Sequence, residues 1–449
     1  MAAGDGALFE QLLSPALLGT AMVTTFMVLI MTKRMSAVAA LLIIPILFGL
    51  VAGAGADLGR MIIDGVLQVA PTALMLTFAV LYFAIMMDAG LFDPLVRRVL
   101  AMVGDDPVRI ALGTAGLATL VSLDGDGTTT ALIIITAFLP VYRRVGMNPL
   151  ILATLLGLCN SLMNYVPWGG PSARAAAAVG ADLGQVFAPL IPAMLVGFMA
   201  IFTLAWLFGR SERRRLAGTA PLSGGDTGKP LAARLEIDLE ARRPRLFWFN
   251  LALTLGLVLG MILGLAPLPV MMMGAFAIAV TVNYPRMRDQ KARISAHADN
   301  VVNIVVLLFA AGAFTGILNG TGMADAMARA ALDVVPDAIG PYMAPITALA
   351  SMPLTFVMSN DAYYFGVVPI IANAAASYGI GADVIARASL IGQPVHTLSP
   401  LLAPIYLACG LLGVDVADAQ RFALKWAVLV SLVVLVAAIA TGAIPLRAG

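Results

Sequence analysis

Two aspartates stand in a short polar stretch, residues 122–130, which reads Ser-Leu-Asp-Gly-Asp-Gly-Thr-Thr-Thr between two strongly apolar segments. An ionised side chain inside a bilayer costs about 2.5–3.5 kcal/mol on insertion scales, so such residues indicate function. Asp124 and Asp126 can share a proton, bind a hard cation such as Mg²⁺ or Ca²⁺, or do both in turn. In a structural alternative, one of them only caps the following helix. We predict metal binding and proton coupling for both.

Hydroxyl and amide side chains follow the aspartates at positions that favour ligand contacts. Thr128 and Thr129 stand at the start of the outgoing helix, where hydroxyls and the helix N-terminus can hold an anionic group. Asn160 and Asn164 lie on one face of the next apolar helix, because they are four residues apart. Their amides serve either a ligand or polar packing between helices. We predict substrate contacts for all four residues.

Arg174 is the only arginine between residues 145 and 209, a strongly apolar part of the chain. It follows the sequence Pro-Trp-Gly-Gly-Pro, which interrupts an apolar helix. A guanidinium there either pairs with one of the two aspartates or receives a substrate carboxylate through two hydrogen bonds, and the two roles can alternate. We favour the substrate contact. Three neighbours in the same stretch are predicted to contact the substrate as well: Gly169, Gly170 and Ser172.

A second polar group interrupts an apolar segment late in the chain. Ser359, Asn360 and Asp361 follow one another directly, and each offers oxygen atoms to an ion or a substrate. We predict substrate contacts for Ser359 and Asn360. For Asp361 we predict metal binding and proton coupling, as for the first two aspartates.

The last broken helix carries a histidine and two hydroxyl residues. His396 is one of only two histidines in the chain. A histidine at membrane depth either carries protons or is packed with its hydrogen bonds satisfied; we include it among the residues for proton coupling. Thr397 and Ser399 flank the break, and we predict that they complete the substrate site.

The composition predicts an all-α polytopic membrane protein. Of the 449 residues, 61% are hydrophobic and 12% are charged, whereas soluble domains have about 45–50% and about 25%. Apolar runs of about 20 residues are long enough to cross a bilayer as helices. The net charge of +2 is too small to indicate nucleic-acid binding.

The chain divides into two similar halves, residues 1–208 and 246–449, around a polar segment, 209–245, that we predict to be a cytoplasmic linker. Each half has apolar spans, an interfacial helix, a re-entrant hairpin, a broken span and a closing span. The predicted hairpins are about 107–142 and 342–377, and the predicted broken spans are about 149–180 and 382–411. Segment 88–100 aligns with 320–332 at a constant offset, with Gly90 matched to Gly322. This alignment indicates an internal repeat.

The distribution of basic residues predicts that the two halves have inverted topology. Basic clusters such as Lys33-Arg34, Arg143-Arg144 and the loop 286–293 can all be cytoplasmic at once. The acidic connections, among them 57–64, are then external. One hairpin opens inside and the other outside, and their tips meet near the membrane midplane. Paired broken helices in inverted repeats are typical of the substrate site of a secondary transporter.

Three motifs resemble the metal-citrate:proton symporter family (CitMHS) of the ion-transporter superfamily. They are Leu123–Thr130, Pro167–Arg174 and Leu29–Arg34, and the resemblance extends from about Phe26 to the last span. The polar residues 359–361 and 399–400 resemble the corresponding motifs of the second half. Sodium-coupled relatives in the superfamily carry Ser-Asn-Thr at both hairpin tips. The aspartates at the first tip here suit protons and divalent metal better than sodium.

The resemblance implies uptake of citrate complexed with a divalent cation, Mg²⁺ or Ca²⁺, driven by protons. The metal travels with the substrate, and no permanently bound cofactor is implied. The resemblance also implies a homodimer in a bacterial inner membrane, in contact with membrane lipid, in which a transport domain slides along a scaffold as an elevator. A metal complex fits this membrane site physically, since it lowers the net charge that has to be desolvated.

Three other functions are weighed against this one. A proton-coupled di- or tricarboxylate carrier without a metal requirement would use the same residues. An intramembrane aspartyl protease also needs two membrane aspartates, but Leu123 occupies the position of the first glycine in the Gly-x-Gly-Asp pattern of one such class. A channel would need a ring of repeated donors, and the two tips differ in sequence.

Overall fold

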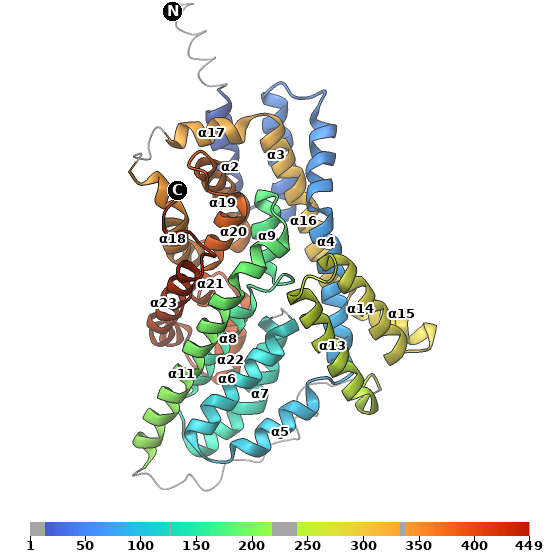
Figure 1. Ribbon diagram of the computed structural model, residues 1–449, viewed down its shortest axis with the longest axis vertical. Coiled ribbons are helices and arrows are strands. Elements are labelled where there is room, and N and C mark those ends of the chain that lie inside the picture. The colour runs from blue at the N-terminus through green and yellow to red at the C-terminus, as the bar shows by residue number, and fades with distance from the viewer. Residues whose placement is uncertain (1–13, 125–126, 218–239, 333–337, 449) are drawn as a thin grey trace, which may run out of the picture.

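The computed structural model describes residues 14–124, 127–217, 240–332 and 338–448. These residues form helices joined by turns and contain no strand (Figure 1). Gly125 and Asp126 lie outside the described residues, and for Asp124 only the backbone is described. The helices of the described residues confirm the prediction of an all-helical protein.

Five helical segments are long and apolar enough to cross a membrane. They are Leu58–Asp88 (α4), Leu183–Leu216 (which includes α11, Ile191–Leu216), Pro244–Ile262 (which includes α13, Phe247–Ile262), Ala298–Gly320 (α16) and Val416–Ala440 (α23). Shorter apolar helices include Pro15–Met31 (α2), Ala37–Val51 (α3) and Leu268–Asn283 (α14). Helix α4 begins earlier than expected, so Asp64 belongs to this helix and not to a connection.

Helices α4 and α16 pack together along a run of small residues. Gly312 and Gly316 are four residues apart on α16, and a methyl group built on Gly65 of α4 would overlap the carbonyl oxygen of Gly312. Small residues at this spacing let two helix backbones approach closely within a membrane. Figure 1 shows α3, α4 and α16 side by side on one side of the molecule.

The segments predicted as hairpins consist of paired helices. The first has Pro107–Val121 (α6), a short 3₁₀ turn Ser122–Asp124 (η1) and Gly127–Val145 (α7). The second has Met343–Val357 (α18), a π-helix Ala362–Val367 (η5) and Val368–Ala376 (α19). In Figure 1, α6 and α7 lie toward one end of the molecule, and α18 and α19 lie toward the other. The inverted relation of the two halves stays a prediction.

The segments predicted as broken spans contain helices separated by irregular backbone. The first consists of Pro149–Met163 (α8) and Gly170–Val179 (α9), with the interruption at 164–169. The second consists of Ala382–Leu390 (α20), Gln393–His396 (α21) and Ala403–Leu412 (α22). Non-helical backbone at membrane depth persists only where protein or a cavity satisfies its polar groups. These interruptions are therefore where a ligand site is expected.

Two helices lead into the hairpins from aligned positions of the internal repeat. Asp93–Val103 (α5) precedes the first hairpin, and Met323–Leu332 (α17) precedes the second. The matched residues Gly90 and Gly322 have φ of +83° and +69°. This left-handed conformation strains residues that carry a Cβ atom, so both chain reversals need glycine.

The base of the first hairpin is fastened to the end of α11. Asp106 caps α6 by accepting a hydrogen bond from the Val108 amide, and it accepts bonds from Arg213 at 2.6 Å and 3.1 Å. Glu212 accepts a bond from the Asn148 amide at 3.0 Å. Because of these contacts α11 continues to Leu216, although residues from 209 onward were predicted as linker.

The Asp106–Arg213 contact predicts a pH-dependent stability. Burial opposes ionisation of Asp106, but the Arg213 guanidinium and the Val108 amide together hold the pKa of this carboxyl below its ordinary value of 3.8. A lowered pKa in the folded state gives stability that is present above the ordinary pKa and is lost as pH falls through the folded value. We expect Asp106→Asn to lower the melting temperature at neutral pH, by a difference that shrinks below about pH 4.

Thermal unfolding of the detergent-solubilised variants across this pH range is the measurement. Asp105→Asn is the matched control, since its side chain is 74% exposed and pairs with Arg144, whose side chain is 53% exposed. An Asp106→Asn difference that is the same at neutral and acid pH would contradict the assignment.

Candidate functional site

A cavity of about 200 Å³ lies between residues of the two halves. Helices α7, α8 and α9 of the first half contribute to its wall, and so do the tip of the second hairpin, the second interruption, α22 and α23. The polar lining residues are Asn160, Asn164, Asn360, His396 and Thr397. All five are candidates from the sequence, so the fold brings together polar residues that are up to 237 positions apart.

Three buried polar atoms of the lining residues have no hydrogen-bond partner within the described part of the chain: Asn160 Oδ1, Asn360 Oδ1 and His396 Nε2. Buried polar atoms are nearly always paired in proteins, so an unpaired group in a cavity wall indicates a ligand or ordered water. Two of these atoms are amide oxygens, which suit a hard cation or a hydroxyl donor. The cavity is therefore prepared for a polar ligand.

His396 is held in one orientation at this cavity. The side chain is 1% exposed, and its Nδ1 lies 2.6 Å from the Thr355 carbonyl oxygen. A carbonyl oxygen only accepts hydrogen bonds, so Nδ1 carries the proton and donates. The neutral ring then presents Nε2 as an acceptor, and a second proton at Nε2 would make it a donor.

Arg174 and Asp361 form an ion pair that joins the two halves. Arg174 Nε donates to Asp361 Oδ1 at 2.7 Å, and the side chains are 23% and 22% exposed. Arg174 lies on α9, which packs against α20 and η5. A Cβ atom on Gly170, which lines the cavity, would lie 2.9 Å from Arg174 Nη1. The pair therefore adjoins the cavity wall, and a side chain at position 170 would displace the guanidinium.

Asp361 was not predicted as the partner of Arg174. Its predicted partners were the substrate or the aspartates at 124 and 126, whereas the described structure pairs it with Asp361. The residue Asp361 itself was singled out as an oxygen donor. Only the packing of α9 against the second hairpin places the two charges together.

Gln393 is a further residue of the site that the sequence reasoning missed. It is fully buried, accepts from Asn164 Nδ2 at 3.3 Å and donates to Tyr364 OH at 2.9 Å. It thereby connects the first interruption, the second interruption and the π-helix η5. The available signal was a glutamine between a glycine and a proline inside an apolar segment.

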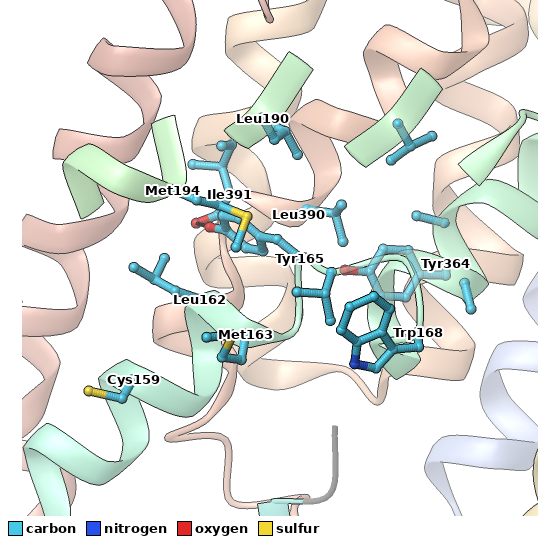
Figure 2. Close-up of a cluster of buried hydrophobic side chains, with 14 of the residues drawn as sticks. Cys159, Leu162, Met163, Tyr165, Trp168, Leu190, Met194, Tyr364, Leu390 and Ile391 are labelled. Carbon is cyan, nitrogen blue, oxygen red and sulfur yellow. Dashed lines mark hydrogen bonds between the residues drawn. The ribbon is translucent and has the colours of Figure 1, made fainter. Parts of the chain in front are cut away.

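A cluster of buried, mostly hydrophobic side chains packs around the two interruptions. Figure 2 shows Tyr165, Trp168, Tyr364, Leu390 and Ile391 in this cluster. Trp168 Nε1 donates to the Leu123 carbonyl oxygen at 2.7 Å. The first interruption is thus attached to the turn η1 at the tip of the first hairpin.

Several predicted site residues bond to backbone in this structure. Ser172 Oγ donates to the Asn164 carbonyl at 2.9 Å, Ser399 Oγ donates to the Phe356 carbonyl at 2.7 Å, and Thr397 Oγ1 donates to the Pro394 carbonyl at 2.9 Å. Ser359 Oγ accepts from the Ala362 amide at 3.2 Å. These bonds satisfy backbone groups that the interrupted helices leave unpaired.

The remaining predicted residues lie at the start of α7 and in the first interruption. Thr128 is exposed and Thr129 partly exposed at the start of α7. A Cβ atom on Gly169 would overlap the Asn164 carbonyl oxygen, so this glycine is needed for the turn. Among the described residues no group of three or more His, Cys, Asp or Glu side chains is gathered for a metal.

Comparison with protein families and characterised sequences gives one consistent result. The family model described as citrate transporter, CitMHS, matches residues 26–392. A Bacillus subtilis protein named citrate transporter is 52% identical over 429 residues, which cover 96% of this chain and 99% of that protein. The Mg(2+)/citrate complex secondary transporter of B. subtilis is 47% identical over 430 residues, with 96% and 99% covered. Another B. subtilis protein, the uncharacterized transporter YraO, is 47% identical over 434 residues, with 95% and 99% covered.

Two solved structures have a similar fold. The YdaH transporter of Alcanivorax borkumensis superposes with a TM-score of 0.57 at 15% identity, over 87% of this chain and 89% of that one. MtrF of Neisseria gonorrhoeae superposes with a TM-score of 0.58 at 14% identity, over 88% and 87%. At these identities the likeness concerns the fold alone. The family model and the relatives identify this chain as a member of the citrate transporter family CitMHS. It is a multi-pass membrane transporter and not an enzyme.

Proposed function

We propose that this protein takes up citrate complexed with a divalent cation, Mg²⁺ or Ca²⁺, by symport with protons. The observation that carries the proposal is the cavity between the halves, where Asn160, Asn360 and His396 each present an unpaired buried polar atom. An ion pair of opposite charges stands beside it. The name of one relative, a Mg(2+)/citrate complex secondary transporter, supports the same substrate.

The proposed roles follow from the chemistry of each side chain. Arg174 receives a citrate carboxylate through two hydrogen bonds, because its planar guanidinium matches that geometry. Asp361, Asp124 and Asp126 contact the metal and take up protons, and His396 Nε2 offers a further protonation site. The substrate-contacting residues are Thr128, Thr129, Asn160, Asn164, Gly169, Gly170, Ser172, Ser359, Asn360, Thr397 and Ser399.

The proposed transport mechanism rests on two inverted repeats, 1–208 and 246–449, connected by a linker at 209–245. Each repeat contributes a hairpin, about 107–142 and 342–377, and a broken span, about 149–180 and 382–411. These elements move together as an elevator against a scaffold formed by the early spans of each repeat. The functional unit is a homodimer in the bacterial inner membrane, in contact with lipid.

Uptake of labelled citrate into proteoliposomes tests the function. An inward proton gradient is applied with Mg²⁺, with Ca²⁺, and with a chelator that removes both. We expect uptake that needs a metal and stops when a protonophore collapses the gradient. Gradient-driven uptake that persists with chelator would instead establish a carboxylate carrier without a metal requirement, and absence of citrate uptake in every condition would refute the proposal.

A further inference from the structure

We propose that the Arg174–Asp361 ion pair makes this site selective for the metal–citrate complex over free citrate and over free metal. The inference rests on the proposed function. When no substrate is bound, Arg174 and Asp361 neutralise each other. Only a ligand that carries a cation and a carboxylate together can replace both partners at once. Arg174 then exchanges Asp361 for citrate, and Asp361 exchanges Arg174 for the metal.

The geometry leaves room for this exchange. The bond joins Arg174 Nε to Asp361 Oδ1, and within the described residues no other hydrogen bond of these two side chains is seen. About a fifth of each side chain is accessible, with 23% exposed for Arg174 and 22% for Asp361. Arg174 Nη1 lies over Gly170, and Asp361 follows Asn360; both of these neighbours line the cavity. A ligand in the cavity can therefore reach the pair.

The charges decide which ligands are favourable. Free citrate at Arg174 would leave the Asp361 carboxylate unpaired beside further citrate carboxylates, and like charges in a poorly solvated site repel. A free divalent cation at Asp361 would leave the Arg174 guanidinium unpaired beside that cation. Separating an ion pair in such a site is unfavourable when one partner stays unpaired. When the complex binds, Arg174 pairs with a citrate carboxylate and Asp361 pairs with the metal, so neither charge is left unpaired.

The unpaired atoms of the cavity fit the cation end of the complex. Mg²⁺ and Ca²⁺ take oxygen ligands, from carboxylates, amide carbonyls and water. Asn360 Oδ1 and Asn160 Oδ1 are buried amide oxygens without a partner, one beside Asp361 and one on the facing helix α8. These neutral atoms add ligands without changing the balance of charge.

Binding of labelled citrate to the purified protein in lipid nanodiscs tests the inference, either with chelator or with whichever of Mg²⁺ and Ca²⁺ gives the stronger binding. We expect wild type to bind citrate only with the metal. Asp361→Asn leaves Arg174 without its partner, so citrate affinity in chelator should rise by about ten- to a hundredfold, the size of one charge-assisted hydrogen bond. The metal dependence of this variant should disappear. The double variant Arg174→Gln with Asp361→Asn, which leaves no unpaired charge and should fold, is expected to bind weakly and equally in both conditions.

Asp383→Asn is the matched control, since Asp383 forms an ion pair with the buried Arg387 on α20, and neither these residues nor their neighbours in the chain line the cavity. This variant should keep the wild-type metal dependence. Metal-dependent binding by wild type together with an unchanged metal dependence in both Asp361 variants would overturn the inference alone. Wild-type binding that is equal with chelator and with either metal, or absent with Mg²⁺, with Ca²⁺ and with chelator, would overturn the proposed function and the inference with it.

Discussion

Gln393→Leu is expected to lower citrate affinity by about ten- to a hundredfold. Leucine has a similar volume but no amide, so Asn164 Nδ2 and Tyr364 OH would both lose their partner. Each buried polar group left unpaired costs about 1–3 kcal/mol. The part of this cost that must be met to restore the geometry of the site on binding lowers the affinity, by about a factor of ten for each 1.4 kcal/mol. Because Gln393 joins the two interruptions and η5, the loss should loosen the relative positions of Asn164 and the Asn360–Asp361 tip.

A double-mutant cycle with Tyr364→Phe separates this role from general destabilisation. In the Gln393→Leu background the tyrosine hydroxyl is already unpaired, so removing it should cost less than in wild type. Ser389→Ala is the control, because Ser389 is fully buried but bonds only to the Ala386 carbonyl of its own helix. Strictly additive effects of the two substitutions on citrate binding would show that Gln393 does not act through Tyr364.

Gly316→Ala is expected to destabilise the protein by about 3 kcal/mol, the upper end of the cost of overpacking. A Cβ atom at this position would overlap the Met61 carbonyl oxygen and lie 3.0 Å from Gly65 Cα. Both neighbours are backbone atoms of α4, so no rotamer change relieves the contact. Helices α4 and α16 would have to separate along their whole crossing, with loss of packing on both.

The fraction of folded protein after heating, followed by size-exclusion chromatography in detergent, measures this effect. Gly256→Ala is the matched control, since Gly256 also lies in an apolar helix but a Cβ atom there meets nothing within 4 Å. Alanine favours helix over glycine by about 1 kcal/mol, so the control should melt no lower than wild type. Equal melting of Gly316→Ala and wild type would mean that the two helices are less closely packed than described.

Much of the helical architecture could be predicted from the sequence, because its signals are local. Apolar runs, the polar stretches at 122–130 and 359–361 near which α6 and α18 end, and the turns at Gly90 and Gly322 all depend on residues close together in the chain. The limits of α4 and α11 could not be predicted from hydropathy. Helix α4 begins at Leu58 despite Asp64, and α11 continues to Leu216 because Asp106 and the Asn148 amide bind its last turns.

The sequence by itself determined the chemical inventory of this transporter: carboxylates, amides, one arginine and one histidine in segments that are otherwise apolar. Only the tertiary structure decided which of them meet. Arg174 reaches Asp361 across 187 positions, and Asn164 reaches Gln393 across 229. The physical reason is that an ion pair, or a hydrogen bond between two amide side chains, forms only at distances of a few ångströms. Those distances arise from the packing of α9 and α8 against the second half, which no local pattern of residues encodes.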